Sequence, residues 1–179
     1  MRRLLAVIAI ALAAWNAVPA QAAQAPDTLV GKPARARPPH HVAFPAIGDW
    51  NTLNIGLSRT MCFGACPAYA VEILGDGTVT WHGGSNVATL GNASATVAKA
   101  DVRALYRAFR RADFFWLYDS YRAPITDLPT YTVTISYDGH VKSVADYAGL
   151  SAGMPRAVVD LEAMIDKVAN TQQWIKPAP

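Results

Sequence analysis

One thirteen-residue pattern occurs twice in this chain, and the two copies start 62 positions apart. The first copy spans residues 67–79 and the second spans residues 129–141, and both read P-x-Y-x-V-x-I-x-x-D-G-x-V. Apolar residues at every second position predict strands with one buried face, and Asp-Gly between two such runs predicts a hairpin turn. The sequence therefore predicts a duplicated β-hairpin, which constrains the architecture but not the activity.

The alternation of apolar residues also predicts the turn length. In the first copy, a three-residue loop over residues 75–77 pairs Ile73 with Val79 and keeps the apolar side chains on one face. A turn shorter by one residue would move them to opposite faces, so we expect the longer loop, with its last glycine in a left-handed conformation. The same rule predicts that Ile135 faces Val141 in the second copy.

An amphipathic helix is predicted after each hairpin. Apolar residues recur at helical spacing in two stretches, Val102, Leu105, Tyr106 and Phe109 in the first and Val158, Leu161, Ile165 and Val168 in the second. Alternation at Leu53, Ile55 and Leu57 predicts one strand before the first hairpin. The order β-ββα-ββα predicts an α+β fold with a mainly antiparallel sheet of about five strands and two helices on one face. We expect the other, threonine-rich face to be solvated or, alternatively, to be a flat binding surface.

The N-terminus has the features of a signal peptide. Arg2 and Arg3 precede an apolar stretch over residues 4–14, which is too short to span a bilayer, and Ala20-Gln21-Ala22 suits signal peptidase. We therefore divide the chain into a signal peptide over residues 1–22, a proline-rich disordered linker over residues 23–48 and a single domain over residues 49–179. The mature protein is expected to be periplasmic or secreted, with no transmembrane segment.

The charge of the expected domain argues against nucleic acid as a partner. Without Arg2 and Arg3 the chain has 14 basic and 13 acidic residues, and from Asp49 onward it has 11 basic and 12 acidic residues. Nucleic-acid-binding domains usually carry a basic excess. The arginines on one side of the first predicted helix are expected to form a solvated face, with an anion or anionic-lipid site as the alternative; they are Arg103, Arg107, Arg110 and Arg111.

The only two cysteines are Cys62 and Cys66. Residues four apart in a strand lie roughly 13 Å apart, whereas a disulfide requires a Cα separation of about 4.4–6.8 Å. The segment must therefore turn for the cysteines to pair, and Gly64 permits the turn. Because disulfides persist in oxidising compartments, we interpret the pair as a local structural disulfide in the loop between the first two strands.

Two other roles for these cysteines are open. A labile bridge could exchange with thiols, although redox cysteines usually stand at a helix N-terminus. Over six residues, Cys-x-x-x-Cys-Pro resembles the copper-delivery proteins of cytochrome oxidase assembly, which implies a Cu(I) site at Cys62 and Cys66 with a distant histidine such as His140. Those proteins have a thioredoxin fold, which the repeat does not predict, so our first expectation is that the chain has no cofactor.

Several motifs spread over residues 57–174 resemble an uncharacterised bacterial family. They include Cys62-Phe-Gly-Ala-Cys-Pro67, Gly75-Asp76-Gly77-Thr78-Val79, Thr126-Asp127-Leu128-Pro129 and Asp146-Tyr147-Ala148-Gly149. This domain of unknown function is marked by CFGxCP and TDxP motifs and occurs in secreted proteins, sometimes beside ankyrin repeats. The resemblance implies no established activity, cofactor or catalytic residue, and it weighs against copper delivery.

The repeat places two loops at equivalent positions, because Cys66-Pro67 and Leu128-Pro129 both lead into a hairpin. We predict that these loops form the distinctive surface, with Arg59, Asp119, Asp127 and Asp146 as its candidate polar groups. The alternative for Asp127 is a purely local role in a turn.

No motif in the chain is typical of an enzyme. It has no Gly-x-Ser-x-Gly elbow, no glycine-rich phosphate loop and no histidine and carboxylate spacing suited to zinc. The sequence therefore favours a non-enzymatic domain that binds or stabilises an unidentified envelope protein or ligand. A thiol redox or Cu(I)-binding protein is the alternative.

Overall fold

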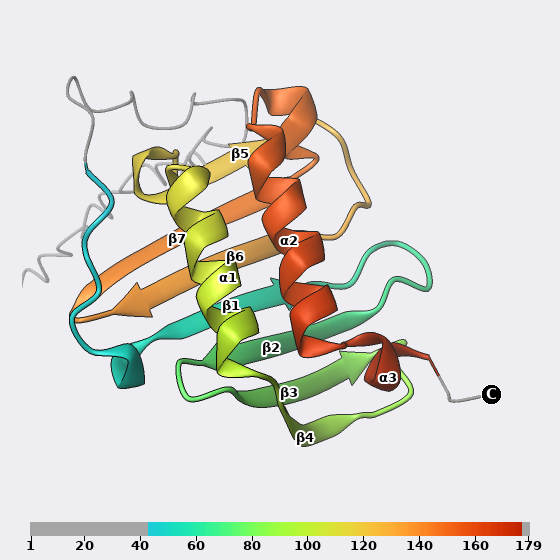
Figure 1. The fold of residues 1–179 in the computed structure, drawn as a ribbon. Helices are drawn as coiled ribbons and strands as arrows, with labels where there is room; N and C mark the ends of the chain where they lie inside the picture. Colours follow the sequence, from blue (N-terminus) through green and yellow to red (C-terminus); the bar gives the residue numbers. More distant parts are fainter. Residues whose placement is uncertain (1–42, 177–179) are drawn as a thin grey trace, which may run out of the picture.

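The computed structural model describes residues 43–176, which form one seven-stranded sheet with two long helices across one face (Figure 1). The strands are β1 (Asn54–Arg59), β2 (Ala68–Leu74), β3 (Thr78–Ser85), β4 (Gly91–Thr96), β5 (Ser120–Arg122), β6 (Tyr131–Tyr137) and β7 (His140–Tyr147). The helices are α1 (Lys99–Arg111), α2 (Arg156–Ala169) and α3 (Gln172–Ile175), with 3-10 turns η1 (Trp50–Thr52), η2 (Phe114–Trp116) and η3 (Gly149–Ala152). The predicted signal peptide and residues 23–42 of the predicted linker lie outside the described residues.

The sheet order is β4-β3-β2-β1-β6-β7-β5, and every neighbouring pair is antiparallel except β5 and β7. The α+β class and the mainly antiparallel sheet are therefore confirmed. The predicted count of five strands and two helices is wrong, because β4, β5 and α3 were not predicted. β4 has the sequence Gly-Asn-Ala-Ser-Ala-Thr and β5 has only three residues, so neither gives the strong apolar alternation by which strands are recognised.

The apolar core lies between the sheet and the two helices. All three residues of the first alternating run, Leu53, Ile55 and Leu57, are buried. The residues that were predicted to form the buried face of the first helix, Val102, Leu105, Tyr106 and Phe109, are also buried. In α2 the predicted buried positions are confirmed at Val158, Leu161 and Ile165, whereas Val168 is partly buried.

The first hairpin has the predicted register. Ile73 faces Val79, and residues 75–77 form the loop between β2 and β3. Gly77 has φ +97°, a left-handed conformation, and its N–H donates to the carbonyl oxygen of Leu74 at 3.0 Å. The alternation of buried residues was therefore sufficient to predict this turn.

The second hairpin has a different register from the prediction. Its turn contains only Asp138 and Gly139, both with positive φ, and Ile135 faces Lys142 instead of Val141. As a consequence the Val141 side chain lies on the exposed face and is 68% exposed. The expected pairing of Ile135 with Val141 is wrong.

The shorter turn is explained by a contact with the N-terminal segment. The Asp138 carboxylate accepts hydrogen bonds from the Gly48 N–H at 2.5 Å and the Thr52 hydroxyl at 2.9 Å. Asp-Gly with positive φ at both positions is a favoured two-residue hairpin turn. These partners are 86 to 90 positions away in the chain, so they cannot be inferred from the hairpin sequence alone.

The same N-terminal segment packs on the domain before Asp49. The Phe44 ring lies 5.6 Å from the Tyr106 ring and 5.0 Å from the Phe115 ring, centroid to centroid. The carbonyl oxygen of Pro45 accepts hydrogen bonds from the Tyr137 hydroxyl at 2.8 Å and the Tyr106 hydroxyl at 3.3 Å. Residues 43–48, which the sequence assigned to the linker, therefore contribute to the edge of the core.

Candidate functional site

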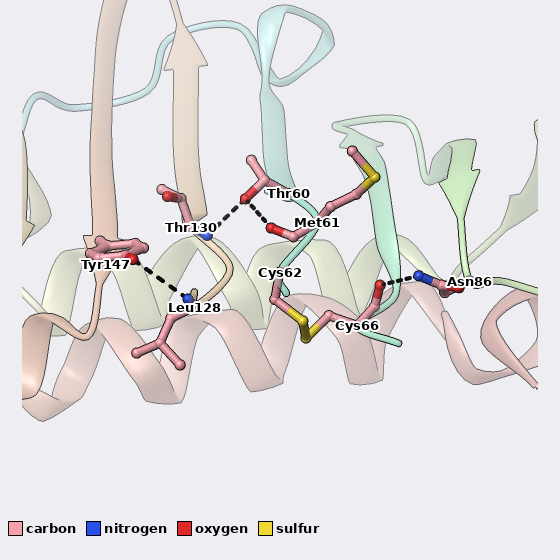
Figure 2. The surroundings of a disulfide bond; sticks show 8 residues. All are labelled: Thr60, Met61, Cys62, Cys66, Asn86, Leu128, Thr130 and Tyr147. Carbon is pink, nitrogen blue, oxygen red and sulfur yellow. Dashed lines mark hydrogen bonds between the residues drawn. A yellow bond between two sulfur atoms is a disulfide. The ribbon is translucent and has the colours of Figure 1, made fainter. Parts of the chain in front are cut away.

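Cys62 and Cys66 lie in the connection between β1 and β2 and are joined by a disulfide, with a Cα separation of 5.7 Å (Figure 2). Gly64 has φ +149° at the middle of the loop, as the turn required. Cys66 precedes β2 through Pro67, and neither cysteine stands at the start of a helix. The expected proximity of the two cysteines is therefore confirmed.

The disulfide loop contacts the loop that leads into the second hairpin. The Thr60 N–H donates to the Thr130 carbonyl oxygen at 3.0 Å, and the Thr130 N–H donates back to the Thr60 hydroxyl at 2.9 Å. The Phe63 N–H donates to the carbonyl oxygen of Asp127 at 3.1 Å. The two segments at equivalent places in the repeat thus form one surface, which we call the loop pair and define as residues 60–67 and 123–130.

Each half of the loop pair is also attached to the rest of the domain. The Cys66 carbonyl oxygen accepts a hydrogen bond from the Asn86 side chain at 3.2 Å, and the Leu128 N–H donates to the Tyr147 hydroxyl at 3.5 Å (Figure 2). Together with the disulfide, these contacts hold the loop backbone in one arrangement.

The loop pair exposes four large apolar side chains. Met61 is 65% exposed, Phe63 87%, Ile125 45% and Leu128 41%. Single exposed apolar residues are common on protein surfaces, but several on two loops that are hydrogen bonded to each other are typical of interaction sites. We refer to these four residues as the apolar tip.

A row of side chains from four strands lies next to the loop pair, on the helix-facing side of the sheet. Arg59 on β1 is the register partner of Tyr69 on β2 and of Tyr131 on β6, and Tyr131 is in turn the partner of Asp146 on β7. The Arg59 guanidinium lies 4.6 Å from the Tyr131 ring centroid and 5.9 Å from that of Tyr69. Both tyrosines occupy the third position of the repeated pattern, so the duplication supplies an aromatic ring on each side of one arginine.

Helix α2 places two carboxylates near this row, one helical turn apart at Glu162 and Asp166. The Tyr69 hydroxyl donates to Asp166 at 2.7 Å, and the Asp146 carboxylate accepts the N–H of Gly149 at 2.5 Å. Glu162 is only 7% exposed, and within residues 43–176 its Oε1 has no hydrogen-bond partner. We call Asp146, Glu162 and Asp166 the carboxylate cluster.

The surroundings of the carboxylate cluster shift the pKa values of Glu162 and Tyr69. Burial and, after it, the nearby negative charges of Asp146 and Asp166 together raise the pKa of Glu162 to about 8, whereas Arg59 opposes the shift. Burial, followed by the Asp166 charge, raises the pKa of the Tyr69 phenol far above its usual value, so that Tyr69 remains a hydrogen-bond donor. At neutral pH the Glu162 carboxyl is therefore mainly protonated, which reduces its repulsion with the neighbouring acids.

The four predicted polar groups of the loop surface do not all lie together. Arg59 and Asp146 belong to the row beside the loop pair, and Asp127 is part of the loop pair itself. Asp119 instead forms an ion pair with Lys142 at 2.5 Å, at the start of β5.

The histidine of the alternative copper set is distant from the cysteines. His140 begins β7 and pairs with Tyr137 at the far end of β6, whereas the cysteine loop lies at the Tyr131 end. Six residues of strand separate these ends by roughly 20 Å. Among residues 43–176, no group of three or more histidine, cysteine or carboxylate side chains has an arrangement that could hold a metal ion.

Four residues of this site were not predicted from the sequence: Tyr69, Tyr131, Glu162 and Asp166. The two tyrosines occupy the same position of the repeated pattern, but the alternation of apolar residues predicts only that they belong to the core. Glu162 follows Leu161 in an amphipathic helix, where a charged residue normally faces solvent. Only the packing of α2 over the end of the sheet brings these four side chains together.

The opposite, open face of the sheet carries two shallow hollows of about 340 and 240 Å³. Both hollows are lined in part by Ala70 and Glu72 of β2. The larger one also has His82 and Asn92, whose side chains are hydrogen bonded at 2.8 Å, and the smaller one has Thr132 and Thr134. This face therefore provides hydroxyl and amide groups, away from the carboxylate cluster.

Residues 53–169 match a family described as domain of unknown function (DUF6438), and the chain belongs to this family. The match agrees with the resemblance to an uncharacterised domain family. A search of curated proteins gave no match to the chain. Within residues 43–176, no helix combines the length and the apolar character that crossing a membrane would require.

Proposed function

We propose that this member of the DUF6438 family is an exported, non-enzymatic binding domain that contacts another envelope protein through the apolar tip. The observation that carries the proposal is the exposure of four apolar side chains on two loops that are fixed to each other. Protein interfaces are enriched in Phe and Met, and a few large apolar side chains supply most of the binding free energy.

The rigidity of the loop pair supports a role in binding. Ordering of flexible loops on association reduces affinity, and a loop already held by a disulfide and backbone hydrogen bonds avoids much of this cost. Phe63, at 87% exposed, lies between the two cysteines, where the disulfide restricts its backbone most. The fold itself does not need an exposed phenylalanine at this position.

Export is supported by two features of the chain. Residues 1–22 have the charge, apolar stretch and small residues of a signal peptide. The disulfide between Cys62 and Cys66 is stable only where thiols are not kept reduced. Both features fit the periplasm or the extracellular medium, where another envelope protein is available as a partner.

The decisive experiment places a photo-crosslinking amino acid at Phe63 in the native host and compares it with the same substitution at Val141. Val141 is a matched control because it is 68% exposed and lies on the hairpin at the opposite end of the sheet. We expect a discrete crosslinked protein from position 63 and none from position 141. No adduct, or the same adduct from both positions, would exclude the apolar tip as the binding surface.

Two apolar-to-serine substitutions within the apolar tip test the same surface. Phe63→Ser and Met61→Ser replace side chains that are 87% and 65% exposed, so the melting temperature is expected to remain close to that of the parent. Recovery of the crosslinked partner by affinity purification is expected to fall strongly for both. Unchanged recovery would show that the partner binds elsewhere.

The alternative function is thiol exchange or Cu(I) binding at Cys62 and Cys66. It ranks second because low-pKa redox cysteines usually stand at a helix N-terminus, and these cysteines precede a strand. Free-thiol titration of protein purified under non-reducing conditions separates the two functions. Resistance to mild reductant supports a structural bridge, whereas ready reduction with stoichiometric copper uptake would reverse the order.

A further inference from the structure

Basic residues are concentrated on one helix of a domain that is nearly neutral as a whole. Five of the 11 basic residues from Asp49 onward belong to α1, but only one of the 12 acidic residues, Asp101, does so. The five are Lys99, Arg103, Arg107, Arg110 and Arg111, and all are exposed. The net charge of the domain therefore conceals a strongly cationic surface.

These five residues form a single stripe. Lys99, Arg103, Arg107 and Arg111 are each four positions apart, and Arg110 lies beside them. At 3.6 residues per turn they fall within an arc of about 120°. The buried side chains of α1 occupy a different side of the helix, so the stripe faces away from the core. We call it the α1 basic stripe.

Within the described residues, no ion pair with an acid neutralises the α1 basic stripe. None of the five side chains forms an ion pair with a carboxylate of the described part of the chain, residues 43–176. Arg103 instead lies over the ring of Trp50, with its guanidinium 5.0 Å from the centroid. Trp50 is partly exposed at the flank of the helix. Tryptophan beside basic residues is the combination found where proteins meet the headgroup region of a membrane.

We propose that the α1 basic stripe docks the domain on a membrane surface rich in anionic phospholipid. The phosphate headgroups of such a surface form an extended negative layer, which is complementary to five cations along a 13-residue helix. Nucleic acid is the less suitable polyanion, because Trp50 beside the stripe suits a lipid interface and the domain as a whole has no basic excess. This inference is independent of the apolar tip, which lies at the loop end of the sheet.

The expected gain in membrane affinity follows from the number of basic residues in the α1 basic stripe. Each basic residue near an anionic leaflet contributes about a fivefold increase in affinity. Five aligned residues are therefore worth on the order of a thousandfold over an uncharged helix face. Because the attraction is electrostatic, it is expected to weaken steeply when salt shortens the Debye length from about 10 Å to about 3 Å.

The test is co-sedimentation of the chain, purified as its host processes it, with vesicles of equal parts phosphatidylcholine and phosphatidylglycerol. Vesicles of phosphatidylcholine alone and salt of about 1 M are the two reference conditions. We expect binding only to the mixed vesicles at low salt. Equal binding to both vesicle types, or no binding to either, would overturn the proposal.

Charge reversal localises the binding. The variant Arg107→Glu/Arg111→Glu is expected to bind the mixed vesicles at least about 25-fold more weakly. The matched control is Arg156→Glu/Lys167→Glu, which makes the same change in net charge at exposed positions of α2. Equal losses in the two variants would show a dependence on net charge alone and would contradict docking through α1.

A charge-conserving variant and a competing polyanion complete the vesicle-binding experiment. The variant Arg107→Lys/Arg111→Lys keeps the charge and is expected to retain binding, and the alanine pair replaces the glutamate pair if charge reversal prevents folding. Duplex DNA is offered at the same low salt. Tighter binding to the duplex than to the vesicles would assign the stripe to nucleic acid and refute the membrane proposal.

Discussion

Arg59 and Tyr131 are register partners on β1 and β6, and the Arg59 guanidinium lies 4.6 Å from the centroid of the Tyr131 ring. Tyr69 on β2 flanks Arg59 from the other side at 5.9 Å. The two tyrosines come from the two copies of the repeat, while Arg59 comes from the unrepeated strand between them. The duplication therefore creates an aromatic slot for one cation, which offsets the negative charge of the carboxylate cluster.

The first prediction concerns this cation. Replacing Arg59 by Gln removes a partly buried positive charge that lies near Asp146 and Asp166, so we expect the free energy of unfolding to fall by about 2–3 kcal/mol. Urea unfolding at neutral pH measures the change.

A double-mutant cycle distinguishes electrostatic compensation from simple packing. In a Glu162→Gln background at pH 9, where Glu162 of the parent is ionised, Arg59→Gln is expected to cost measurably less than in the parent, because one of the negative charges that Arg59 opposes is absent. An identical cost in both backgrounds would mean that Arg59 acts only through its contacts with the tyrosine rings.

The second prediction is the pH dependence of stability that Glu162 confers. Its pKa is about 8 in the folded state, above the ordinary value of 4.5, so the folded protein binds a proton that the unfolded chain has released. Stability from this group is fully present below pH 4.5 and is lost as the pH rises to about 8. We expect the decline to amount to about 2–4 kcal/mol, since each pKa unit corresponds to about 1.4 kcal/mol.

The Glu162→Gln variant isolates this contribution. Glutamine does not ionise, so the variant is expected to lose less stability than the parent between pH 5 and pH 8. Its advantage over the parent should be largest near pH 9, as measured by urea midpoints. Parallel pH profiles for the two proteins would contradict a buried, protonated Glu162.

The extent of sequence-based prediction differs between the two hairpins. In the first, the alternation of Ile73 and Val79 was sufficient, because their burial leaves one register. In the second, the same rule failed, because Asp138 is held by Gly48 and Thr52 from a distant segment. A local pattern predicts a turn only where no remote contact stabilises an alternative.

The candidate site likewise has some features that the sequence predicts and others that it does not. The approach of Cys62 to Cys66 followed from chain geometry, and the meeting of the two loops followed from their equivalent positions in the repeat. The burial of Glu162 could not be predicted from the sequence, because a glutamate in an amphipathic helix is ordinarily solvated. Its environment depends on how α2 crosses the sheet, and this crossing is set by tertiary packing rather than by helical periodicity.

The third prediction concerns the disulfide. The variant Cys62→Ser/Cys66→Ser is expected to fold, because a five-residue loop closes little chain entropy and the bridge is worth about 2 kcal/mol at most. The hydrogen bonds from the Thr60 and Phe63 N–H groups to the second loop do not involve the cysteine side chains, so we expect them to persist without the bridge. Thermal unfolding should show one cooperative transition at a modestly lower temperature. Crosslinking of the partner from position 63 should fall strongly in the same variant, although the domain remains folded. A globally unfolded variant would show that the bridge supports the whole fold.

The last prediction separates the backbone of Asp127 from its side chain. Asp127 has φ +70°, its carbonyl oxygen accepts the Phe63 N–H, and its carboxylate accepts a hydrogen bond only from the adjacent Thr126 among the residues that the structure describes. Alanine is strained at positive φ, so Asp127→Ala is expected to lower the free energy of unfolding by about 1 kcal/mol, and Asp127→Gly should recover most of this loss. Crosslinking from Phe63 is expected to be retained in both variants, because each keeps the carbonyl group that positions Phe63. If both variants instead lost the crosslinked partner at unchanged stability, the carboxylate itself would be a contact of the partner, and the local role of Asp127 would be refuted.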